Sequence, residues 1–262
     1  MDASIEPAEA ASAFTSDQYA DAYPPGIEHG YWTLTRNRLL SDLLIEADKG
    51  GLWDRTDTLL EIGCGTGIVV NALRERGYEA WGVELAEPPA LPAAVPYLML
   101  GRDALDLDPA FRGKVTAILL LDVIEHIAEP VGFLAALVGA YPRCRIFVLT
   151  VPARQEVWSN YDTYYGHYRR YDRALLTRTL REAGLDPTIS RYFFFPLYVA
   201  ARLLALARRR RAVLVQSPRH LGLQRALASA FYAIERIVRP FPALPGLSLM
   251  AVAVRPATPG RL

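Results

Sequence analysis

A short apolar run followed by closely spaced glycines is the feature that most constrains the fold of this 262-residue chain. The run 58–63, TLLEIG, has the length of a buried strand, and the amphipathic stretch 68–77 after it predicts a helix. The glycines between them, in the sequence GCGTG, allow the backbone to approach a ligand closely. A strand, a glycine-rich turn and a helix in this order predict a ligand site at the end of the strand.

The spacing of these glycines and two later carboxylates narrows the class of ligand. A dinucleotide-binding loop needs its third glycine where Ile68 stands, and a phosphate-binding Walker loop needs a Gly-Lys pair that is absent. A ligand with a ribose and an amino-acid tail, but no phosphate, fits better. Glu84, at the end of the next apolar run, can accept two hydrogen bonds from a ribose diol. Asp103 can accept from an adenine amine, or it is an ordinary turn aspartate.

Apolar runs and amphipathic segments alternate along the rest of the chain, which predicts an α/β fold with a largely parallel sheet. We expect residues 1–25 to be a flexible tail and 26–262 to form one domain. Within it, 26–48 should form a lid helix and 195–245 a helical cap insertion. The expected strands cover residues 58–63, 80–85, 96–101, 117–123, 145–151, 188–193 and 247–254.

The motifs LLEIGCGTG, GVEL, GRDALDL, LLLDVIEHI and REAGL resemble those of class I S-adenosylmethionine-dependent methyltransferases over roughly Tyr31 to Arg191. The resemblance implies a Rossmann-like seven-stranded sheet, mostly parallel with the last strand antiparallel, and helices on both faces. It also implies S-adenosylmethionine at the carboxyl ends of the first strands. The cofactor residues implied by position are Glu61, Gly63, Cys64, Gly65, Gly67, Glu84, Leu85, Asp103, Ala104 and Asp122.

In this family a segment before the first strand often closes over the cofactor. Here that segment is the lid helix 26–48, in which Tyr31, near the start, is a further candidate cofactor-binding residue. Either Arg36 or Arg38 should meet the carboxylate of the cofactor, and we assign Arg36. The alternative is an ordinary surface helix whose aromatic residues pack on the sheet.

Methyl transfer to a hydroxyl or amine also needs a group that takes up one proton. His126, in the motif Asp122-Val-Ile-Glu-His126, is a candidate base, although it can instead hold the geometry of the following turn. Ubiquinone-pathway O-methyltransferases and small-RNA 3′-end methyltransferases carry a similar Glu-x-x-Glu-His motif thought to hold a divalent cation. His167 would be a distant further ligand here, but the first acid differs, and we expect no metal.

The tyrosine-rich stretch 159–172, SNYDTYYGHYRRYD, follows the fifth expected strand at the edge where the methyl donor would lie. Binding residues concentrate in such loops, so we interpret it as the acceptor loop. His167 and Tyr165 are its candidate proton handlers. Arg169 and Arg170 can instead pair with Asp162 or Asp172. The candidate substrate-binding residues are Trp158, Tyr161, Tyr164, Tyr168 and Arg169.

The insertion 195–245 has apolar residues at helical spacing and many arginines. We favour a cap that packs its apolar face on the sheet edge, because charge runs are usually solvated. Contact with an anionic membrane or a lipid-like substrate through 195–239 is the alternative.

The net charge of +1 disfavours a nucleic-acid partner, and the two distant cysteines suggest neither a disulfide framework nor a zinc site. The acidic N-terminus does not resemble a signal peptide, so we expect a cytoplasmic protein that can associate with membranes. We expect O-methylation of a small-molecule acceptor that is apolar, lipid-like or a secondary metabolite. The alternatives are a metal-assisted RNA-end 2′-O-methyltransferase and a non-catalytic, membrane-peripheral cofactor-binding protein.

Overall fold

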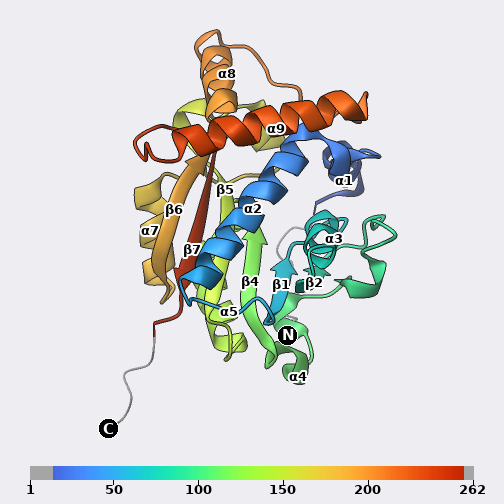
Figure 1. Cartoon of the computed structure of the whole chain (residues 1–262), viewed down its shortest axis with the longest axis vertical. Coiled ribbons are helices and arrows are strands. Elements are labelled where there is room, and N and C mark those ends of the chain that lie inside the picture. Colours follow the sequence, from blue (N-terminus) through green and yellow to red (C-terminus); the bar gives the residue numbers. More distant parts are fainter. Residues whose placement is uncertain (1–13, 257–262) are drawn as a thin grey trace, which may run out of the picture.

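The computed structural model describes residues 14–256, in which a seven-stranded sheet is surrounded by helices (Figure 1). All seven expected strands are present, which confirms the predicted fold class. Their bounds are β1 Thr58–Ile62, β2 Glu79–Glu84, β3 Leu98–Leu100, β4 Val115–Leu121, β5 Ile146–Pro152, β6 Asp186–Phe193 and β7 Ser248–Val254.

The sheet order, β3-β2-β1-β4-β5-β7-β6, determines where a ligand can bind. The first five strands pair in parallel, and β7 is antiparallel to both of its neighbours. The chain moves outward in one direction from β1 and in the other direction from β4. A crevice therefore opens at the carboxyl ends of these two central strands.

Helices cover both faces of the sheet, with α2 across the front in the view of Figure 1. Asp172 caps one of them as expected, since its Oδ1 accepts from Leu175 N at 2.7 Å. The α-helices are α1 Ser16–Ala22, α2 Tyr31–Lys49, α3 Ile68–Arg74, α4 Pro109–Arg112, α5 Pro130–Ala140, α6 Asn160–Tyr164, α7 Arg173–Glu182, α8 Phe195–Leu206 and α9 Leu221–Val238. Short 3₁₀ helices are η1 Ile27–His29, η2 Val95–Tyr97, η3 Ala104–Asp106, η4 Ile124–His126 and η5 Gln155–Val157.

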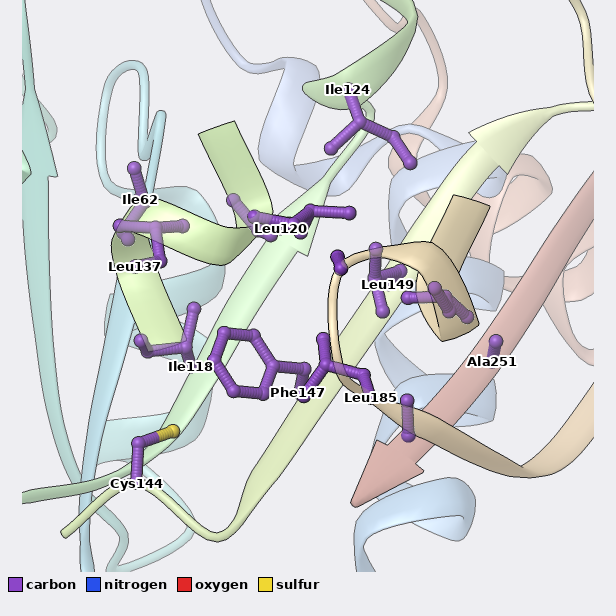
Figure 2. Close-up of a cluster of buried hydrophobic side chains, with 14 of the residues drawn as sticks. Ile62, Ile118, Leu120, Ile124, Leu137, Cys144, Phe147, Leu149, Leu185 and Ala251 are labelled. Atoms are coloured by element: carbon purple, nitrogen blue, oxygen red, sulfur yellow. The ribbon is translucent and has the colours of Figure 1, made fainter. Parts of the chain in front are cut away.

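Two apolar clusters, one on each face, hold the sheet between its helices. Every residue of β4 is buried, as its almost uninterrupted apolar run predicts for a central strand. On one face Phe147 and Leu149 meet Leu137 of α5, and Leu185 packs beside them (Figure 2). The ends of β1 and β4 are therefore rigid supports for the loops that follow them.

The expectation of a flexible tail over 1–25 is wrong for the part of it that the structure describes. Residues 1–13 lie outside the described part, but Ser16–Ala22 form α1. Thr15 and Gln18 make a reciprocal capping box at its start, and Gln18 Nε2 donates to Tyr164 O at 2.6 Å. The N-terminal helix is thus part of the domain and packs near the expected acceptor loop.

The segment 195–245, in which we expected a helical cap, contains α8 and α9. Helix α9 packs on α2, with Leu227, Phe231 and Val238 turned inward, so it covers a helix and not the bare sheet edge. The other half of its apolar stripe, which includes Leu223 and Ile234, is exposed. Within residues 14–256 no helix is both long enough and apolar enough to cross a bilayer.

Glu235 fastens α9 to the first turn of α8, because its Oε1 accepts from Phe195 N at 3.0 Å. Burial raises the pKa of Glu235 to about 7. A carboxyl whose folded pKa lies above its unfolded value of 4.5 binds its proton more tightly in the folded state. Its contribution to stability is therefore present at low pH and is lost as the pH rises from about 4.5 through about 7.

We expect Glu235→Gln, which keeps the accepting oxygen, to remove this loss. Between pH 5 and pH 8 the wild-type free energy of unfolding should fall relative to the variant by up to about 3 kcal/mol. Urea unfolding at both pH values measures the difference. Parallel pH profiles for the two proteins would contradict the assignment.

Candidate active site

The loop after β1 is built from glycines whose backbone other residues cannot easily adopt. Gly63, Gly65 and Gly67 have φ of 74°, 53° and 82°, in the left-handed region. A Cβ on Gly65 would meet the Tyr23 hydroxyl at 2.7 Å, and one on Gly63 would meet Val123 at 2.8 Å. Side chains of other elements thus pack directly on the backbone of these three glycines at the end of β1, a loop that we call the glycine cradle.

Glu84 ends β2 beside this cradle, where it is buried. Its Oε2 accepts from Gly65 N at 2.8 Å, and its Oε1 accepts from Leu85 N at 2.9 Å. Burial and the adjacent Glu84 carboxylate raise the pKa of Tyr19, which lies on α1. The carboxylate is thus held in a fixed orientation next to the cradle.

A second charged group links the lid helix to β4. Arg36 of α2 lies 3.5 Å from Asp122, measured from Nη1 to Oδ2, and its guanidinium stacks on Trp32. Asp122 has a φ of 58°, which is rare for a residue with a side chain and marks a strained position at the strand end. Burial raises the pKa of Glu61 to about 8, although Arg36 opposes this, and Glu61 Oε2 has no partner.

The remaining residues expected at the cofactor differ in their burial and in their contacts. Asp103 accepts from Leu105 N at 2.8 Å, so it also fulfils the role of a turn aspartate. Cys64 and Ala104 are buried, and Leu85 is exposed. Tyr31 packs on Phe231, with ring centroids 5.1 Å apart, which places it in the contact between α2 and α9.

Arg38 donates to Ser229 on α9. Of the two lid arginines that the sequence left open, the structure therefore brings Arg36 to the strand ends.

The motif after β4 forms η4 and buries an unpaired acid next to two imidazoles. Both oxygens of Glu125 lack a hydrogen-bond partner, and burial raises the pKa of this carboxyl well above its ordinary value. Burial also lowers the pKa of His126 to about 3. The rings of His126 and His167 meet edge to face at 4.7 Å. One ligand atom from each of Glu125, His126 and His167 lies within 4.8 Å of the others.

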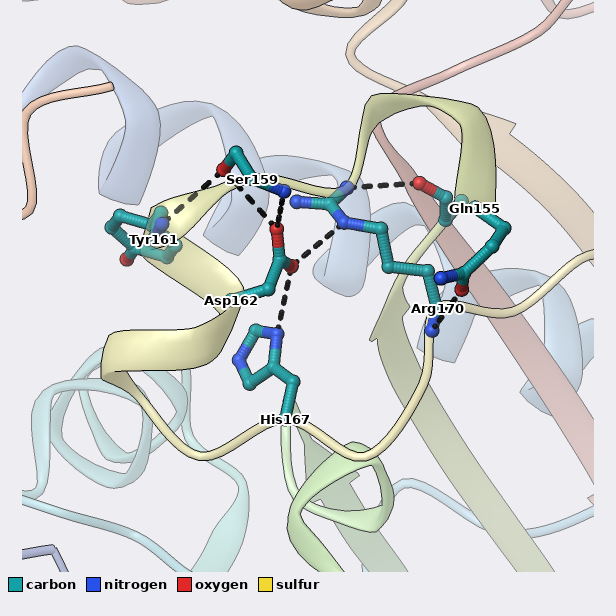
Figure 3. A network of polar contacts seen from close by, with 7 residues as sticks. Gln155, Ser159, Tyr161, Asp162, His167 and Arg170 are labelled. Carbon is teal, nitrogen blue, oxygen red and sulfur yellow. Dashed lines mark hydrogen bonds and ion pairs between the residues drawn. The ribbon is translucent and has the colours of Figure 1, made fainter. Parts of the chain in front are cut away.

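His167 is held in place by a buried ionic network (Figure 3). Its Nδ1 lies 2.9 Å from Asp162 Oδ1, and Arg170 Nε donates to the same oxygen at 2.7 Å. Although burial acts in the opposite direction, the hydrogen bonds from His167 and Arg170 lower the pKa of Asp162 to about 2. Asp162 Oδ2 also accepts from Ser159 N. The pairing of Arg170 with Asp162 that the sequence offered as an alternative is thus present.

The tyrosines of the acceptor loop are divided among several roles. The Tyr165 hydroxyl donates to Val213 O at 2.9 Å, and burial raises its pKa above the ordinary range, so it is poorly suited to accept a proton. Tyr164 donates to Asp21 on α1. Tyr161 packs on Tyr165 with centroids 4.6 Å apart, and Tyr168 is exposed.

Trp158 lies near the ring of His167, at 6.5 Å between centroids. Arg169 donates to Ala128 O at 2.6 Å and so binds the loop after η4 instead of a carboxylate. The residues that sequence reasoning missed are Tyr19 and Tyr23 of the N-terminal segment and the carbonyl of Val213. The Thr15-x-x-Gln18 capping box was the available signal for α1.

Comparison with known proteins defines the class of protein that carries this site. The model of a methyltransferase domain matches residues 31–188, more than half of the chain, so the chain belongs to the methyltransferase-domain family. It is a class I S-adenosylmethionine-dependent methyltransferase, as the sequence motifs predicted.

Curated relatives include the ubiquinone biosynthesis O-methyltransferase of Idiomarina loihiensis, 30% identical over 125 residues that make up 44% of this chain and 49% of the relative. The enzyme of the same name from Pseudomonas paraeruginosa is 27% identical over 96 residues, 34% of this chain and 40% of that relative. The alignments thus span about half or less of the length of these relatives.

Among solved structures, magnesium protoporphyrin IX methyltransferase from Synechocystis PCC 6803 superposes with a TM-score of 0.51 at 15% identity, over 92% of this chain and 93% of that chain. The 1,6-didemethyltoxoflavin-N1-methyltransferase of Burkholderia thailandensis gives a TM-score of 0.51 at 18% identity, over 98% of both chains. These likenesses show the fold.

The residues at the strand ends fit S-adenosylmethionine. Gly63, Gly65 and Gly67 carry no side chains of their own, Glu84 is a fixed acceptor beside them, and Glu61 has an unpartnered buried oxygen. The sulfonium cofactor supplies an electrophilic methyl group when bound. The protein must then align an acceptor atom with that methyl group and, for a hydroxyl or amine acceptor, take up one proton.

Proposed function

We propose that this enzyme methylates a hydroxyl group of a small apolar acceptor, with His167 as the general base and His126 beside it. The observation that carries the proposal is the His167–Asp162–Arg170 network. A carboxylate at Nδ1 fixes the orientation and tautomer of an imidazole, so that Nε2 is left to accept a proton. The names of the curated relatives, which are O-methyltransferases, support oxygen as the acceptor atom.

We propose the following contacts with the cofactor. Glu84 accepts hydrogen bonds from the ribose diol, the glycines Gly63, Gly65 and Gly67 face the methionine side with Glu61, and Asp103 faces the adenine. Arg36 binds the carboxylate of the cofactor, in exchange for its present partner Asp122. In the acceptor loop, Trp158 and Tyr161 form the walls around the substrate.

The cluster of Glu125, His126 and His167 favours a second mechanism on the same site. A buried carboxylate without hydrogen bonds beside two imidazoles is also the donor set of a divalent cation. These three residues would hold the ion, which would polarise the acceptor hydroxyl. An RNA-end acceptor remains the alternative substrate for such a metal-assisted enzyme, and the net charge of +1 disfavours it.

The test is a methyl-transfer assay with labelled S-adenosylmethionine against matched sets of phenols, aliphatic alcohols and amines, with a short RNA as a further acceptor. We expect transfer to apolar hydroxyl compounds and none to RNA. Transfer to amines alone would overturn the assignment to oxygen. Binding of S-adenosylhomocysteine without any transfer would favour a non-catalytic cofactor-binding protein.

A further inference from the structure

Helix α8 presents to solvent apolar side chains that a soluble surface rarely leaves uncovered. Leu203 and Leu206 are 63% and 64% exposed, and Val199, one turn earlier, is 41% exposed. These positions follow helical spacing, so they lie along one side of the helix. We call Val199, Leu203, Leu204 and Leu206 the apolar ridge. In Figure 1 the end of α8 that carries it stands away from the sheet, above α9.

The segment that contains the ridge is also strongly basic. Residues 195–245 hold nine arginines and a single acidic residue, Glu235, a net charge of +8. The whole chain has 29 basic and 28 acidic residues, so the remainder has 20 and 27, a net charge of −7. The ridge is followed directly by the arginine run Arg208–Arg210, all exposed. The near-neutral net charge of the chain therefore conceals a cationic segment with exposed apolar residues, 195–245, which we call the arm. The rest of the chain is acidic.

We infer that this arm binds the surface of an anionic lipid bilayer, with the apolar ridge inserted among the acyl chains and the arginine run at the headgroups. Exposed leucines next to a basic cluster are the combination that interfacial helices use. Charge complementarity selects this occupant. A second copy of the arm would bring eight further positive charges to the same face, and a nucleic acid would match the arginines but leave the leucines in water.

Within the arm, residues 207–220 join α8 to α9 and contact the candidate active site. Arg211 N donates to Asn160 Oδ1 at 2.9 Å, and the Arg211 guanidinium lies 5.0 Å from the centre of the Tyr161 ring. Val213 O accepts from Tyr165, and Val215 N donates to Asp21 O on α1. If the proposed function is correct, a bilayer bound at the ridge therefore contacts a segment that is hydrogen-bonded directly to the acceptor loop.

Vesicle co-sedimentation of the full chain tests the inference, with vesicles of phosphatidylcholine alone or mixed with phosphatidylglycerol. We expect the protein to sediment with the mixed vesicles only, and salt to weaken the binding. Arg209→Glu/Arg210→Glu should weaken the partition coefficient at least about thirtyfold, and Leu203→Asp at least about tenfold. The matched controls outside the arm, Arg143→Glu/Arg178→Glu and Val95→Asp, should behave as the wild type.

The inference is overturned if the wild-type protein does not bind anionic vesicles, or if the control variants bind them as poorly as the arm variants. It is also overturned if Leu203→Asp binds vesicles as the wild type does, while the arginine variant loses binding to both vesicles and an oligonucleotide. A dimer that Leu203→Asp dissociates, without vesicle binding, would assign the ridge to self-association instead. Binding of S-adenosylhomocysteine measured on the same preparations should be unchanged in all variants. That readout separates failure of membrane binding from failure of the proposed function.

Discussion

Replacement of His167 by alanine is expected to lower kcat about a hundredfold to ten-thousandfold, the range that general bases contribute. The affinity for S-adenosylmethionine should change little, because the glycine cradle follows β1 and Glu84 ends β2, whereas His167 lies in the loop after β5. The structural reason is that Asp162 orients the imidazole, and alanine has no group that takes up the proton. Initial rates at saturating cofactor, with isothermal titration for cofactor affinity, provide the measurement.

The matched control for this variant is His29→Ala, which removes a half-exposed histidine distant in sequence from His167. A second experiment adds a chelator to the assay. If EDTA abolishes turnover of the wild type and Mg²⁺ or Mn²⁺ restores it, the three-residue cluster functions as a metal site. Unchanged kcat in His167→Ala, with and without chelator, would return the acceptor loop to a purely structural role.

Glu84→Gln is expected to raise the Kd for S-adenosylmethionine about thirtyfold to a hundredfold. Hydrogen bonds to a charged acceptor contribute about 1.5 to 3 kcal/mol, and the amide also turns an N–H group towards donors that the carboxylate now accepts from. Titration calorimetry measures the change. Glu87→Gln, at an exposed carboxylate three residues later, is the control and should bind as the wild type.

A thermal unfolding curve of Glu84→Gln separates two causes of weak cofactor binding, which are loss of the ribose contact and loss of stability. Loss of the acceptor at Gly65 N should cost some stability, since this hydrogen bond is buried. If Glu84→Gln binds the cofactor with wild-type affinity, the ribose contact must be assigned to another residue.

The sheet could be predicted because its signals are local. Buried parallel strands such as 115–121 are almost uninterrupted apolar runs, and the closely spaced glycines after β1 indicate a turn between strand and helix. Helix α1 has a local signal too, the Thr15–Gln18 capping box, but a small-residue, acidic surrounding concealed it. It was therefore mistaken for a tail.

The polar site was harder to predict because its parts are distant in sequence. Glu125 and His167 are brought together only when the loops after β4 and β5 are placed at the same edge of the sheet. The tyrosine stretch showed that a site was near, but not which hydroxyls were already used. Tyr165 donates to Val213, which belongs to a connection whose path no local pattern determines.

The separation of charge between the arm and the rest of the chain has a kinetic consequence. A molecule with a net charge of +1 is expected to feel almost no force from a charged surface, yet this one carries a large permanent dipole with its positive end at α8 and α9. In the field of a negatively charged surface the molecule turns before it arrives, so that first collisions favour one orientation. Its encounter rate should therefore depend on ionic strength far more than its net charge suggests.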